Sequence, residues 1–132
     1  INNFGLQEMV YIYPRLDYKD ALDEMLTVDG LLVLQGSICN FQIPAKVYEY
    51  LRAKKPILAL TDSFGDTASF LRKANIDNIA ALDSELEIID QLRLFLHQIN
   101  VGEASITDDD FIVEQSRQTR TVQLAEVLNR YA

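Results

Sequence analysis

The sequence predicts an α/β fold in three layers, with helices on both faces of a parallel sheet. Two observations lead to this prediction. Short apolar runs alternate with amphipathic stretches along the chain, and the run at 31–34 is apolar at every position. A parallel strand is covered on both faces and therefore lacks the alternation of a half-buried strand. Alternating strands and helices imply right-handed crossovers within one sheet.

Four apolar runs are the strand candidates, at 9–13, 31–34, 57–60 and 79–82. The first is rich in β-favouring side chains and stops at Pro14. The fourth has the weakest pattern. We therefore expect a sheet of about four strands.

Residues with capping chemistry mark helices between these runs. Asp17 is placed to cap a helix that stops near Gly30. The buried stripe of that helix is expected to consist of Ala21, Leu22, Met25 and Leu26. Pro44 suits the first position of a second helix, and Asp66 is placed to cap a third.

Two more helices complete the prediction. Ser84 and Glu87 have the spacing of a capping box that opens a long fourth helix. The aspartates at 108–110 precede a single last helix, and we interpret them as a solvated helix start rather than a metal site.

Composition excludes several classes of function. The chain has 132 residues and a net charge of −8, which fits one domain and disfavours binding to nucleic acid or to anionic lipid. No apolar run reaches the length of a membrane span. The single cysteine, Cys39, excludes an internal disulfide and a multi-cysteine metal site, and with one histidine, His97, the chain is poorly supplied for a zinc cluster or a Cys/His catalytic pair. We expect a cytoplasmic setting and no cofactor, and we interpret the chain as a fragment because it begins at Ile1.

Ligands of parallel sheets bind beyond the carboxyl ends of the strands. Three segments are expected there, at 35–44, 61–67 and 83–84. The first leads into Pro44, where the free N–H groups of Ala45 and Lys46 and the helix dipole favour an anion. Lys46 adds a positive charge, and Glu49, about one turn further on, can accept hydrogen bonds from a vicinal diol. Phosphate and diol at this spacing indicate a nucleoside diphosphate.

The segment at 43–59 resembles the signature of the group 1 glycosyltransferases of the GT-B fold, in which a proline seven residues after a helical glutamate opens the next strand. Glu49 and Pro56 keep that spacing. The resemblance extends to the run at 31–34, the loop at 65–67 and the last helix.

The resemblance implies a doubly wound, Rossmann-like sheet, with residues 1–132 forming the later part of the C-terminal donor-binding domain and no complete second domain. It implies that Glu49 holds the ribose of a UDP- or GDP-linked sugar. The family's other motif glutamate falls on Phe41, which cannot contact the transferred sugar as a glutamate does. The nucleotide site is expected to consist of Gly36, Ser37, Ile43, Pro44, Ala45, Lys46 and Glu49.

The resemblance places the acceptor domain and the catalytic residues outside the chain. The parent protein is then a hexosyltransferase that acts on a glycan or lipid acceptor in polysaccharide assembly, peripheral to the membrane, while the chain alone transfers no sugar.

Two alternatives remain. A receiver-like signalling domain is suggested by residues 56–61, although Gln35 occupies the place of its phosphate-accepting aspartate. A non-catalytic interaction module is the other. The implied strand order also leaves strand edges unpaired, so we expect the run at 9–13 to rearrange or to pair with another copy.

Overall fold

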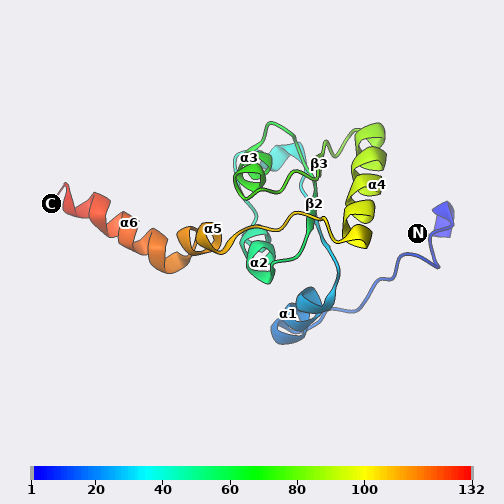
Figure 1. Cartoon of the computed structure of the whole chain (residues 1–132), viewed down its shortest axis with the longest axis horizontal. Coiled ribbons are helices and arrows are strands. Elements are labelled where there is room, and N and C mark those ends of the chain that lie inside the picture. The colour runs from blue at the N-terminus through cyan, green and yellow to red at the C-terminus, as the bar shows by residue number, and fades with distance from the viewer. Residues whose placement is uncertain (1, 132) are drawn as a thin grey trace.

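The computed structural model describes residues 2–131 as a small open sheet flanked by helices (Figure 1). The strands are β1 (Leu31–Leu34), β2 (Ile57–Leu60) and β3 (Ile79–Ala80). The helices are α1 (Tyr18–Thr27), α2 (Ala45–Ala53), α3 (Asp66–Lys73), α4 (Glu85–Val101), α5 (Asp109–Glu114) and α6 (Arg117–Asn129). Two short 3-10 helices, η1 (Asn2–Phe4) and η2 (Ser37–Cys39), complete the elements.

The three strands are parallel and lie in the order β1-β2-β3. Leu31 is opposite Ile57, and Ala59 is opposite Ile79. The central strand β2 is buried at every position, as a strand covered on both faces must be. The predicted α/β class with a parallel sheet is confirmed.

Helices cover both faces of the sheet, which gives the predicted three layers. On one face Val47 and Leu51 of α2 and Leu71 of α3 pack against the sheet in the larger core cluster. On the other face Phe95 of α4 packs against Leu58, Leu60 and Ala80. Figure 1 shows α4 on one side of the strands and α2 and α3 on the other.

The prediction of a strand at 9–13 is wrong. This segment has no regular secondary structure, and its apolar side chains are exposed, Ile12 at 82 %. A strand needs a neighbour to receive its backbone hydrogen bonds, and β1 pairs only with β2 among the described residues. The run at 79–82 forms a strand of two residues only. The sheet of residues 2–131 therefore has three strands instead of about four.

Two of the four predicted helix starts agree with the sequence. Asp17 accepts a hydrogen bond from the Asp20 N–H at 2.9 Å, and Ser84 accepts one from the Glu87 N–H. The other two are shifted by one residue: Pro44 is the N-cap of α2 rather than its first residue, and Asp66 is the first residue of α3 rather than its cap.

Two predictions about helices need correction. The expected stripe of α1 is at most half-buried, because the helix packs beside α2 without being covered from outside. The single last helix is broken into α5 and α6 at Ser116, whose hydroxyl accepts the Thr119 N–H and starts a new helix. As a result, α6 extends away from the sheet (Figure 1).

Gly30 lies where β1 begins and α4 crosses closely. A Cβ at this residue would lie 2.8 Å from Cζ of Phe95 and 2.9 Å from Cδ1 of Ile99. The Phe95 and Ile99 side chains would have to shift to make room for a Cβ, so the glycine lets α4 approach the sheet closely without that rearrangement.

Replacing Gly30 by alanine is expected to destabilise the protein by about 1–3 kcal/mol, the usual cost of overpacking. Urea unfolding measures this change. Gly36→Ala is the matched control, because nothing lies within 4 Å of the added Cβ, and its effect should be small. Equal stability of the two variants would show that α4 does not pack as described.

Candidate functional site

The loop between β1 and α2 is anchored by the buried side chain of Gln35. Its Nε2 donates to the backbone oxygens of Cys39 at 2.8 Å and Gln42 at 2.9 Å. Its Oε1 accepts a hydrogen bond from Oγ1 of Thr61 at 3.2 Å. Gln35 and Thr61 directly follow β1 and β2, so this network joins the loop to the ends of two strands.

A second set of hydrogen bonds joins this loop to the loop that precedes α3. The Asp66 N–H donates to the Asn40 oxygen at 2.9 Å, and Oγ1 of Thr67 donates to the Gln42 oxygen at 3.1 Å. Nδ2 of Asn40 donates to the carboxylate of Asp62. The two loops are therefore held as one unit.

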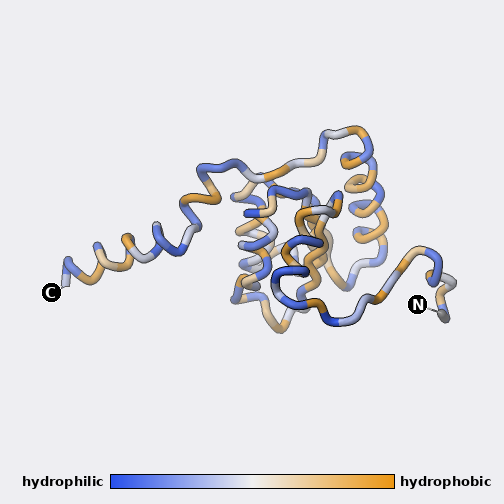
Figure 2. Tube along the Cα trace, turned by 90° about the horizontal axis from the view of Figure 1, so that it is seen from below, coloured by the Kyte–Doolittle hydropathy of each residue, from blue (hydrophilic) through white to orange (hydrophobic). Residues whose placement is uncertain are grey.

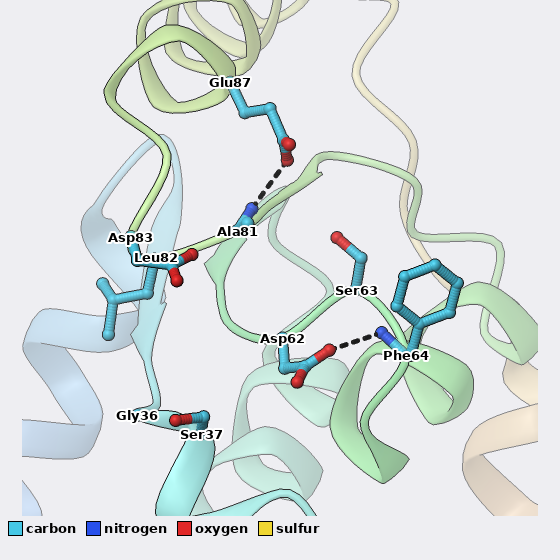
Figure 3. A pocket seen from close by; sticks show the side chains of 9 residues that line it. All are labelled: Gly36, Ser37, Asp62, Ser63, Phe64, Ala81, Leu82, Asp83 and Glu87. Atoms are coloured by element: carbon cyan, nitrogen blue, oxygen red, sulfur yellow. Dashed lines mark hydrogen bonds between the residues drawn. The ribbon is translucent and has the colours of Figure 1, made fainter.

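A cavity of about 360 Å³ opens between these loops at the carboxyl ends of all three strands (Figure 3). Its lining consists of Gly36, Ser37, Asp62, Ser63, Phe64, Ala81, Leu82, Asp83 and Glu87. Three of these side chains are carboxylates, and none is Lys or Arg. The charge of this edge cavity disfavours a phosphate.

Two of its carboxylates are engaged by backbone groups. Asp62 accepts a hydrogen bond from the Phe64 N–H at 2.8 Å, and Glu87 accepts one from the Ala81 N–H at 2.9 Å (Figure 3). The Phe64 N–H, followed by the Asn40 amide, lowers the pKa of Asp62 below its usual value of 3.8. The ring of Phe64 is 97 % exposed.

A second cavity, of about 480 Å³, lies between α1, α2 and β1. Lys46, Glu49 and Tyr50 line it from α2, and Leu31 and Leu32 from β1. Tyr18, Ala21, Leu22, Glu24, Met25, Val28 and Gly30 complete the lining. Lys46 and Glu49 thus share one cavity, while a helix turn separates their backbones.

Lys46 and Glu49 are not paired with each other. The ion pair found within residues 2–131 joins Lys54 to Asp109 at 2.5 Å, elsewhere on the surface. Glu49 is half-buried, and Lys46 is exposed. Both charges therefore remain available to a ligand.

The structure divides the predicted site. Gly36 and Ser37 line the edge cavity, whereas Lys46 and Glu49 line the cavity beside α1. Ile43 packs against the main core cluster, Pro44 is half-buried and Ala45 is exposed. Pro44 accepts the first hydrogen bond of α2, from the Val47 N–H at 3.0 Å, so the N–H groups of Ala45 and Lys46 precede the hydrogen-bonded part of the helix.

The sequence analysis did not select Asp62, Phe64, Asp83 or Glu87. Their signal was present, since the loops at 61–67 and 83–84 were expected at this edge. Glu87 was interpreted only as part of a capping box, but its carboxylate bonds to Ala81 instead of to the cap residue.

No set of three or more His, Cys, Asp or Glu side chains among residues 2–131 is arranged to hold a metal ion. Within the same residues, every helix is too short or too polar to cross a bilayer.

Comparisons with models of protein families, with curated proteins and with solved structures found no match to this chain.

Replacing Gln35 by leucine is expected to cost about 1–3 kcal/mol, because it leaves the buried Thr61 hydroxyl without its partner and removes one of the two donors to each of the Cys39 and Gln42 oxygens. Urea unfolding measures the loss, and amide exchange should accelerate at 36–42. Gln42→Leu is the control, since only the backbone of that residue takes part in the network. An unchanged exchange rate in the Gln35 variant would contradict the anchoring role.

Asp62→Asn is expected to change how the stability of the fold depends on pH in the acid range. A carboxyl group whose folded-state pKa is lowered stabilises the fold above its unfolded pKa and loses that effect as the pH falls through the folded value. The stability advantage of the wild type over the variant should therefore be full at neutral pH and shrink as the pH falls through and below the usual carboxyl pKa of 3.8. Thermal unfolding at each pH measures it.

Asp83→Asn serves as the control, because that carboxylate lines the same cavity without a backbone donor bonded to it among the described residues. Parallel pH curves for the wild type and Asp62→Asn would show that the Phe64 and Asn40 hydrogen bonds do not form in solution.

Proposed function

We propose that the chain binds the nucleoside diphosphate part of a nucleotide sugar, with Lys46 at the phosphates and Glu49 at the ribose. The observation that carries this proposal is that the two side chains line one cavity and are not paired with each other. A helical turn between a cation and a carboxylate matches the separation of phosphate and diol in such a ligand.

The phosphates belong at the start of α2. The free N–H groups of Ala45 and Lys46 and the positive end of the helix dipole favour an anion there. The edge cavity, which holds Asp62, Asp83 and Glu87, offers the opposite charge. Electrostatics therefore favours the α2 side of the molecule for the diphosphate.

The ribose belongs beside Glu49. A half-buried carboxylate without an ion-pair partner accepts two hydrogen bonds from a vicinal diol, and charge-assisted bonds of this kind are stronger than neutral ones. Because no described residue neutralises Glu49, binding a diol also compensates for the partial desolvation of this carboxylate.

The parent protein is then a glycosyltransferase of the GT-B fold, and the chain forms the later part of its Rossmann-like donor-binding domain. It supplies a donor site built from α2 and no catalytic residue. A receiver-like signalling domain is less well supported, because β1 is followed by Gln35, whose amide is engaged on both sides in the loop network.

Glu49→Gln is expected to weaken the binding of UDP or GDP about tenfold or more, since a hydrogen bond to a charged group contributes about 1.5–3 kcal/mol. Titration by NMR gives the affinity, and the amide shifts of the wild type should concentrate at 43–50.

Glu24→Gln is the matched control, because Glu24 lines the same cavity from α1 and has no assigned ligand contact. Its affinity for UDP should not fall. Amide shifts confined to 36–37 and 62–64, or equal losses in both variants, would overturn the proposed site. An unfolded Glu49→Gln chain would instead identify Glu49 as a structural residue.

A further inference from the structure

One edge of the sheet is open along β1. The N–H groups of Leu31 and Gln35 donate to the Pro56 and Leu60 oxygens at 2.9 and 3.0 Å, on the side of β2. Since backbone groups alternate along a strand, those of Leu32 and Leu34 point to the opposite side. The described residues place no strand on that side.

This edge lacks the features that usually prevent strand addition. Natural edge strands carry charges, prolines or bulges. β1 consists of Leu-Leu-Val-Leu with no such residue, and the side chains of Leu32 and Leu34 are 48 % and 63 % exposed.

The same chain carries a segment suited to this edge, which pairs with no strand among the described residues and whose Met9 and Val10 N–H groups donate only to the Leu6 oxygen. Residues 9–13, Met-Val-Tyr-Ile-Tyr, have high β-propensity and no charge. They form no regular secondary structure and are exposed. The N-terminal part of the chain leads outward, away from its own sheet (Figures 1 and 2).

We propose that two copies of this chain associate by strand exchange, with residues 9–13 of each copy pairing along β1 of the other. Each chain offers one segment and one edge that have no strand partner among the described residues, so a two-fold arrangement satisfies both at once. Both elements are uncharged, so the pairing avoids direct repulsion in a chain of net charge −8.

Exposed apolar side chains of both elements are available for burial in such a dimer. A standard interface buries about 800 Å² on each partner, and a fully buried tyrosine contributes about 150–250 Å². Tyr11 and Tyr13 are 67 % and 74 % exposed, and Met9, Ile12 and Leu34 add further apolar surface. The dimer contains two such pairings, and these side chains supply the apolar surface that the pairings bury.

The exchange also bears on the cavity beside α1. Leu31 and Leu32 of the open edge line that cavity, so the added strand contributes to its wall. The association needs no nucleotide to form and is tested without one.

The test is the oligomeric state of the full chain by sedimentation velocity over micromolar to millimolar concentrations. The wild type should form a dimer. Ile12→Pro removes a backbone donor from an exposed segment, so it should abolish the dimer while the circular dichroism spectrum of the folded monomer is retained. Gln7→Pro is the control, because Gln7 occupies the second position of the turn that the Met9 N–H closes onto the Leu6 oxygen, where proline is tolerated.

A second variant, Leu34→Lys, places a charge on the open edge and should also be monomeric. Mixing it with Ile12→Pro should restore a weaker heterodimer, because one variant keeps the segment and the other keeps the edge. A monomeric wild type, a dimer that survives both substitutions, or no heterodimer on mixing would each overturn the proposal. Protection of residues 10–13 from hydrogen exchange in a wild-type monomer would show pairing within one chain instead.

Discussion

The arrangement of the carboxyl edge depends on the buried side-chain amide of Gln35. It accepts from Thr61 at the end of one strand while donating to two backbone oxygens of the loop that follows the neighbouring strand. The loop cannot move as a whole without leaving these buried groups unsatisfied. Polar contacts therefore hold most of this loop, while Ile43 at its end packs against the core and Phe64 is left exposed at the rim of the edge cavity.

Much of the fold could be predicted because its signals are local. Each of these signals lies within a few residues of sequence. They are the continuous apolar runs of β1 and β2 and the caps Asp17 and Ser84. The segment at 9–13 failed as a strand because strand formation requires a partner, which no local pattern reports. The break at Ser116 was missed because one capping hydroxyl decided it within an otherwise helical sequence.

The candidate site was predictable only in part, for a related reason. Helical periodicity alone puts Lys46 and Glu49 on neighbouring turns of one face. Whether Gly36 and Ser37 lie near them depends on the path of the loop. That path is fixed by the hydrogen bonds that Thr67 and Thr61 make to it, whose partners lie 25 and 26 residues apart in the sequence. Spacing in the sequence does not report such contacts. Residues that were expected in one site are therefore divided between two cavities.

The helical break at Ser116 has a consequence for the motion of the molecule. No residue of α6 is buried, and this helix packs chiefly against the short α5. Its stability is therefore set by its own turns and by one junction, while the sheet is stabilised by the core. Helix α6 can therefore fray and re-form many times while the core of the same molecule stays folded.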